Sequence, residues 1–179
     1  MAWHPDDIQF LESLTGDGGK GKGQWRCLVR NGRMLLLIRA GASRDVLKLY
    51  RPQRLLARCV HAFLDLTYAI GGCKLLKRFD LVASEGSALV TVENETKAQV
   101  QAMLFGNAKQ EERRAIMFLK MSDGAHRIAK VGVGPKAKSV IVRECEFINS
   151  WSAGCPAMPE CGSLLEGEHW AAFTEECFY

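Results

Sequence analysis

Apolar residues in the first half of the chain follow two different periods. Residues 24–40, QWRCLVRNGRMLLLIRA, hold two apolar runs on either side of Asn31-Gly32, a strong signal for a tight turn, so we expect a β-hairpin there. Residues 51–72 instead repeat apolar residues every three or four positions, which predicts a helix. The apolar positions of this helix are Leu55, Leu56, Cys59, Val60, Phe63, Leu64 and Ile70.

The last third of the chain predicts a second hairpin, a helix and two short strands. Residues 114–121 and 126–133 are rich in β-forming residues and flank a short turn with a glycine. Helical spacing follows over residues 135–151, and two strand candidates lie around Glu166-Gly167. The order of elements predicts an α+β fold with a mainly antiparallel sheet and packed helices.

The region between these two parts has a weaker pattern. We expect a further short strand within residues 79–94 and a short helical or irregular link at residues 96–106. Polar residues replace apolar ones near residues 92–109, which indicates a domain boundary. The hypothesis is an accessory α+β module over residues 1–100, without an assigned role, and a second unit over residues 101–179.

Composition places the chain among ordinary globular proteins. It has 179 residues, of which 47% are hydrophobic and 25% are charged, so there is enough apolar material for a core. A formal net charge of +4 permits contact with phosphate groups but is far below that of nucleic-acid-binding domains, so we expect no nucleic-acid partner. Neither a membrane-spanning run nor a signal-peptide pattern is present in the sequence, and we expect a cytoplasmic protein.

The seven cysteines do not form a recognisable zinc pattern. Only Cys155 and Cys161 lie close together in the sequence, and the four histidines are scattered, so we expect reduced thiols and no metal site. Small buried thiols are predicted in the apolar segments, at Cys27, Cys59, Cys73 and Cys145.

Two other features resemble ligand sites but have simpler interpretations. Residues 15–23, TGDGGKGKG, are rich in glycine, but Lys22 is followed by Gly23 where a P-loop needs serine or threonine, so a flexible connector is favoured. The predicted helix at 51–72 carries Arg51, Arg54 and Arg58 on one side. A solvated basic face is favoured there over contact with an acidic membrane surface.

Two charged residues occupy apolar faces of the last predicted hairpin and helix. Lys130 shares a strand face with Ile128 and Gly132, and Glu144 lies in the same helical stripe as Ile141. One buried charge is costly, whereas a lysine and a glutamate that meet across a strand–helix crossing offset each other. We therefore predict a Lys130–Glu144 ion pair within about 4 Å. The alternative is that each side chain reaches solvent separately.

This order of elements resembles the small N-terminal lobe of the protein-kinase-like fold. The match consists of a hairpin with a lysine near its end (AKVG, residues 129–132), a helix with a glutamate (RECEFI, residues 143–148), and two further strands. It is most similar to the aminoglycoside and small-molecule phosphotransferase branch and covers about residues 105–179.

The resemblance implies a nucleotide site. Lys130 would hold the α- and β-phosphates of ATP, and Glu144 would hold Lys130 in place. The nucleotide-covering loop would begin at Gly106, and the backbone around Glu175 and Cys177 would contact the adenine edge.

The chain departs from that family where catalysis is concerned. The covering loop lacks G-x-G-x-x-G, no Asp-Phe-Gly occurs, and the one His-x-Asp, His4 to Asp6, precedes Lys130. The catalytic base and the magnesium ligands of the large lobe have no counterpart, so we expect no Mg²⁺ held by this chain alone and no phosphate transfer by it.

Two functional hypotheses follow. The leading one is the ATP-phosphate-binding small lobe of a kinase-like phosphotransferase, truncated or non-catalytic alone, with a separate large-lobe partner or self-association. The other is a stand-alone binding or interaction module in which Lys130 and Glu144 form only a structural ion pair.

Overall fold

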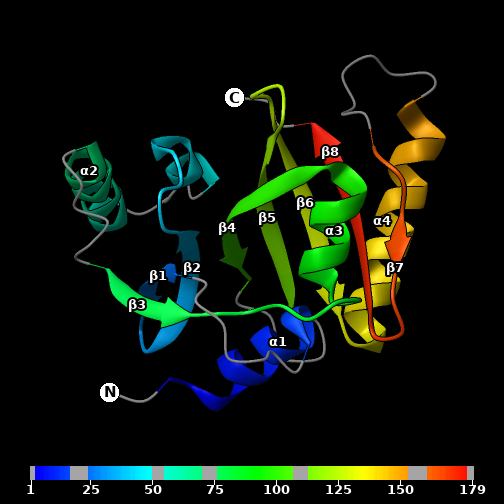
Figure 1. Cartoon of the computed structure of the whole chain (residues 1–179), viewed down its shortest axis with the longest axis horizontal. Coiled ribbons are helices and arrows are strands. Elements are labelled where there is room, and N and C mark those ends of the chain that lie inside the picture. The colour runs from blue at the N-terminus through cyan, green and yellow to red at the C-terminus, as the bar shows by residue number, and fades with distance from the viewer. Residues whose placement is uncertain are drawn as a thin grey trace.

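The computed structural model describes residues 3–16, 24–49, 55–69, 76–106, 113–152 and 161–176. These residues form one antiparallel sheet with helices on both faces, which confirms the α+β prediction (Figure 1). The strands are β1 Gln24–Arg30, β2 Arg33–Arg39, β3 Lys77–Asp80, β4 Ala98–Phe105, β5 Arg114–Met121, β6 His126–Val133, β7 Leu165–Glu166 and β8 Trp170–Glu176. The helices are α1 Pro5–Thr15, the 3₁₀ helix η1 Arg44–Leu49, α2 Leu55–Ala69, α3 Ala88–Thr96 and α4 Pro135–Ser152.

The eight strands follow the order β3-β1-β2-β4-β5-β6-β8-β7, and every neighbouring pair is antiparallel. Both predicted hairpins are present, as β1–β2 and β5–β6. Asn31 and Gly32 have φ angles of 52° and 75°, the left-handed values that a tight hairpin turn needs. The suggested boundary near residue 100 coincides with β4, which pairs with β2 on one side and β5 on the other.

Two elements differ from the sequence expectation. Residues 88–96 form α3 where we expected part of a strand, because the Ser87 side chain accepts a hydrogen bond from the Val90 amide and caps the helix. Residues 98–105 form β4, an interior strand, where we expected a helical or irregular link. Both faces of β4 are covered, so its apolar residues do not alternate with polar ones and the strand period is hidden. Helix α1 is an additional element that the pattern did not predict.

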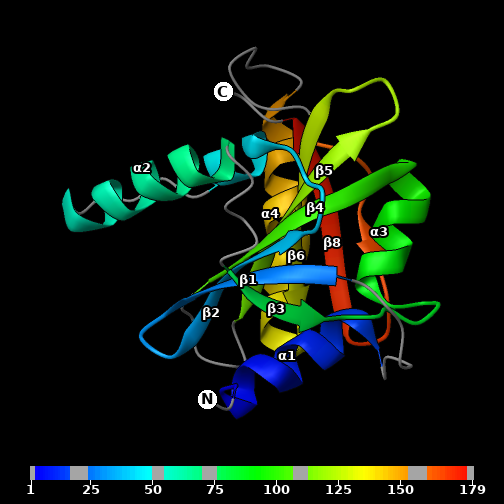
Figure 2. The ribbon, with the colours of Figure 1, turned by 60° about the vertical axis from the view of Figure 1, so that its left-hand side comes forward.

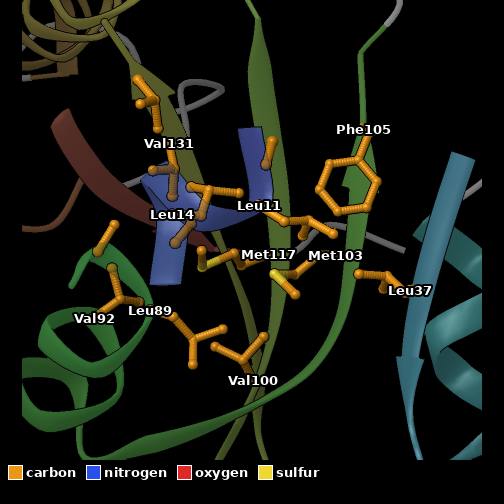
Figure 3. Packing of buried hydrophobic residues seen from close by; sticks show 14 of the residues in the cluster. Leu11, Leu14, Leu37, Leu89, Val92, Val100, Met103, Phe105, Met117 and Val131 are labelled. Carbon is orange, nitrogen blue, oxygen red and sulfur yellow. The ribbon is translucent and has the colours of Figure 1, made fainter. Parts of the chain in front are cut away.

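The main core lies between one face of the sheet and the helices α1 and α3 (Figure 3). Removing these apolar side chains from water is the principal force that holds the helices on the strands. The labelled residues come from α1, α3 and strands β2, β4, β5 and β6: Leu11, Leu14, Leu37, Leu89, Val92, Val100, Met103, Phe105, Met117 and Val131.

Helix α1 is also held by a buried ion pair. The Asp7 carboxylate, which has no exposed surface, lies 2.6 Å from the Arg113 guanidinium and accepts a hydrogen bond of 2.8 Å from the Met34 amide. Arg33 contacts the same carboxylate at 3.0 Å. The Arg113 guanidinium stacks 4.8 Å from the centre of the Phe10 ring. The N-terminal helix is thereby connected to β2 and to the start of β5.

On the opposite face, α4 packs closely over β6 and β8. Gly132 permits this approach, because a Cβ atom there would lie 2.5 Å from the Ala137 carbonyl oxygen and 2.8 Å from Ile141 Cγ1. Ala137, Ile141, Cys145 and Ile148 form the buried side of α4.

Helix α2 extends away from the sheet (Figure 2). It rests on η1, where His61 Nε2 lies 2.9 Å from the Leu47 carbonyl oxygen, and on the turn before η1, where the Tyr68 hydroxyl donates to the Ala42 carbonyl oxygen at 2.7 Å. We predicted Cys59 as a buried thiol. This prediction is wrong, because Cys59 is exposed, as are Phe63 and Leu66 on the same helix.

Candidate functional site

The Lys130 ammonium group lies between two carboxylates. Its Nζ is 2.7 Å from Glu144 Oε1 and 2.8 Å from Glu175 Oε1. The predicted ion pair with Glu144 is therefore confirmed. Glu175 is a second partner that the sequence argument did not assign to Lys130. We call Lys130, Glu144, Glu175 and Arg114 the Lys130 cluster, because Arg114 Nη1 also lies 3.7 Å from Glu144 Oε2.

Strand register explains how these side chains meet. Lys130 of β6 is directly opposite Ile116 of β5 and Phe173 of β8, so the three side chains share the face covered by α4. Glu175 lies two residues after Phe173 and therefore points to the same face. The neighbours Ala129 and Val131 point to the opposite face, into the core under α1 and α3.

The Lys130 cluster is partly buried and balanced in charge. The exposed fractions of the side chains are 24% for Lys130, 31% for Glu144 and 9% for Glu175. Burial alone would lower the pKa of Lys130, but hydrogen bonds and charge attraction from Glu144 and Glu175 outweigh it, and the pKa is raised. Lys130 is therefore a cation at neutral pH, and two carboxylates already contact it.

A cavity of about 270 Å³ adjoins the cluster. One side of the cavity is polar, formed by Arg114, Lys130 and Glu144, and the remainder is mainly apolar. The complete lining is Leu104, Phe105, Gly106, Arg114, Ala115, Ile116, Lys130, Ile141 and Glu144.

Four of the five predicted site residues lie in or beside this cavity. Gly106, Lys130 and Glu144 line it, and Glu175 contacts Lys130 through its side chain. Cys177 lies outside the described residues. Arg114 is an additional site residue that sequence reasoning missed. The predicted hairpin could have identified it, because pairing of its two strands places Arg114 opposite Gly132, two residues from Lys130 on the neighbouring strand.

The other sequence features give a mixed result. Arg58 is exposed, whereas Arg51, Arg54, Cys73 and most of the glycine-rich segment lie outside the described residues. Cys27 and Cys145 are buried as predicted. Among the described side chains, no group of three or more potential metal ligands comes together, and no helix has the length and apolarity needed to cross a membrane.

A second candidate site is an exposed apolar surface on α4. On α4, Val140, Phe147 and Trp151 are 40%, 56% and 59% exposed, and the rings of Phe147 and Trp151 lie 5.8 Å apart. On α2, Phe63 and Leu66 are 61% and 65% exposed, but α2 and α4 lie on opposite sides of the molecule (Figure 1), so these two residues form a separate patch. We call Val140, Phe147 and Trp151 of α4 the helix surface.

No family model matches the chain, and searches of curated proteins and solved structures also gave no match.

Proposed function

We propose that this protein is a binding module that contacts a partner protein through the helix surface. The observation that carries the proposal is that three of the six large apolar residues found exposed in the described structure, Val140, Phe147 and Trp151, lie on the outer side of α4. Contiguous exposed apolar side chains mark interaction sites, and aromatic residues such as Phe147 and Trp151 are enriched where proteins meet.

Charge favours a protein partner over a lipid surface. A helix that lies on an acidic membrane carries mainly Lys and Arg beside its apolar residues. On α4, the exposed residues beside Phe147 include both Arg143 and Glu146. Mixed charges of this kind are suited to the polar rim of a protein interface.

The Lys130 cluster fits the same proposal as a structural feature. Its ammonium group is shared by two carboxylates, so the cluster joins β6, β8 and α4 and keeps α4 oriented with Phe147 and Trp151 outward.

A photo-crosslinking experiment tests this function. A photoreactive phenylalanine analogue is placed at Phe147 or Trp151 of the full chain in cells that produce it, and at Lys120, an exposed polar position of β5, as the control. We expect covalent adducts at 147 and 151 in at least about fivefold higher yield than at 120, because apolar surfaces are covered preferentially. An adduct of twice the chain mass would identify a second copy as the partner. Equal yields at all three positions would contradict the proposal.

Nucleotide binding is a second candidate, favoured by the cavity that brings Gly106, Arg114 and Lys130 together. A phosphate group there would have to share Lys130 with both glutamates, so we expect weak ATP binding. A Kd in the millimolar range corresponds to a binding free energy of about −4 kcal/mol. ATP titration of the ¹⁵N-labelled protein should shift the amide signals of these residues, and Lys130→Met should abolish the shifts. Their absence in the wild-type protein at about 10 mM ATP would reject this candidate.

A further inference from the structure

Two cysteine sulfurs lie in contact behind the Lys130 cluster. Cys145 Sγ, on the buried side of α4, is 3.4 Å from Cys161 Sγ, just before β7. Cys145 is 2% exposed, whereas Cys161 is partly exposed. The Asn149 side-chain amide also approaches Cys145 Sγ, at 3.6 Å. This pairing was not predicted from the sequence, in which the cysteine nearest to Cys161 is Cys155.

We propose that Cys145 and Cys161 are an oxidisable pair that closes into an intramolecular disulfide and fastens α4 to the segment before β7. A disulfide needs a sulfur–sulfur bond of about 2.05 Å, so the sulfurs must approach by only about 1.4 Å. This inference is independent of the proposed partner-binding function, because it concerns a modification of the buried side of α4.

The oxidant can be a small-molecule disulfide such as glutathione disulfide. The more accessible Cys161 loses its proton and attacks one glutathione sulfur, which forms a mixed disulfide and releases one glutathione thiolate. Cys145 then loses its proton and attacks Cys161 Sγ, and the second glutathione thiolate leaves. The protein loses two electrons and two protons, and one glutathione disulfide becomes two glutathione thiols.

The surroundings of Cys145 and Cys161 slow the formation of the disulfide but favour the closed disulfide at equilibrium. Burial, followed by the effects of Cys145 and Glu175, raises the pKa of Cys161 to about 12. Little thiolate is present at neutral pH, so exchange is slow and accelerates as the pH rises. Catalytic disulfides are strong oxidants because their surroundings stabilise the thiolate of the reduced form. The surroundings of Cys161 do not stabilise its thiolate, so the closed bond resembles a structural disulfide that resists reduction.

Formation of the Cys145–Cys161 disulfide would also restrict the movement of the Lys130 cluster. Cys145 follows Glu144 directly in α4, and Cys161 forms a β-bridge with Glu175. The disulfide therefore connects α4, which carries Glu144, to the segment that pairs with Glu175 of β8. A crosslink around a loop of this length lowers the unfolding equilibrium constant by about 100-fold.

Thiol mapping in glutathione buffers tests the proposal. The full chain is equilibrated at about pH 8.5 with glutathione and glutathione disulfide, starting from the fully reduced and the fully oxidised protein. Remaining thiols are alkylated, and peptides are analysed by mass spectrometry without reduction. We expect a Cys145–Cys161 linked peptide from both starting states, together with a rise in the urea midpoint that dithiothreitol reverses.

Variants provide the controls. Cys145→Ala and Cys161→Ala should each lose the linked peptide and the rise in midpoint, whereas Cys59→Ser, at an exposed thiol, should retain both. A dominant link from Cys161 to Cys155 or Cys177, a mixed disulfide with glutathione that does not proceed further, or no link in the oxidised wild-type protein would overturn the inference. The wild-type mapping is decisive even if an alanine variant does not fold.

Discussion

At the scale of single residues, the Lys130 cluster shows how a charge remains on an apolar face. The Lys130 side chain is about three-quarters buried, and the two carboxylate contacts of its ammonium group, at 2.7 Å and 2.8 Å, compensate for the lost water. Glu175 is the most buried of the three partners, with 9% of its side chain exposed, so it depends most on Lys130. The sequence predicted the ion pair with Glu144. The structure adds Glu175, whose side chain is more buried than that of Glu144.

This arrangement predicts an order of stability losses. Lys130→Met leaves two neighbouring carboxylates without their cation and should cost about 2–3 kcal/mol of unfolding free energy. Glu144→Gln should cost only about 1 kcal/mol, because Glu175 still balances Lys130 and the amide can still accept a hydrogen bond. Urea denaturation at pH 7 measures both, with Lys120→Met at an exposed position as the control. Equal losses for the two cluster variants would show that Glu175 does not share the charge.

At the scale of elements, the contact between β6 and α4 depends on a missing side chain. Gly132 faces the first turn of α4, and the space that a Cβ would occupy is filled by the Ala137 carbonyl and Ile141. The helix axis therefore lies closer to the sheet than any larger residue would allow. This closeness brings Glu144, two turns further along α4, within reach of the Lys130 ammonium group.

A glycine-to-alanine pair tests that contact. Gly132→Ala should destabilise the fold by about 1–3 kcal/mol, because backbone atoms of α4 must move away. Gly106→Ala is the matched control, since a Cβ atom at this position would lie 3.4 Å from the Arg114 carbonyl oxygen, an ordinary van der Waals distance. Urea midpoints measure the difference, and ¹⁵N chemical shifts of Glu144 and Lys130 should move only in the Gly132 variant. If both variants have the same stability, the close approach of α4 is not important for folding.

At the scale of the whole molecule, β4 and Asp7 join segments that are far apart in the sequence. Strand β4 is hydrogen-bonded to β2 and β5, so the sheet runs without interruption from β3 to β7. Asp7 connects α1 to Arg33 in β2 and to Arg113 before β5. We therefore expect one cooperative unfolding transition for the residues on both sides of β4.

Asp7 also predicts an acid-dependent stability. Burial alone would raise the pKa of Asp7, but hydrogen bonds from the Met34 amide, Arg113 and Arg33 outweigh it, and the pKa is lowered. A lowered pKa in the folded state means that the stabilisation is complete above the unfolded value of about 3.9 and is lost as the pH falls through the folded value.

Asp7→Asn should therefore cost about 3–5 kcal/mol at pH 7, because Arg113 is left buried without its counter-charge. The variant should also lose part of the acid dependence below about pH 4. Urea melts from pH 3 to 7, followed separately by fluorescence of Trp25 and of Trp170 in single-tryptophan variants, measure both effects. Two transitions at different urea concentrations would show that the chain contains two independent units.

The sequence alone determined the elements whose signal is local. Asn31-Gly32 and the β-rich runs specified the hairpins, and helical spacing specified α4, because turn chemistry and periodicity act within a few residues. The same local patterns placed Lys130 on a face of β6 and Glu144 on a face of α4 that also carry apolar residues. Tertiary structure decided the rest. The assignment of β4 requires strands on both sides, and the exposure of Phe63 depends on how little of α2 is covered by η1. Glu175 and Cys161 reach their partners only through the β6–β8 pairing and the packing of α4, contacts between residues distant in sequence that no local pattern encodes.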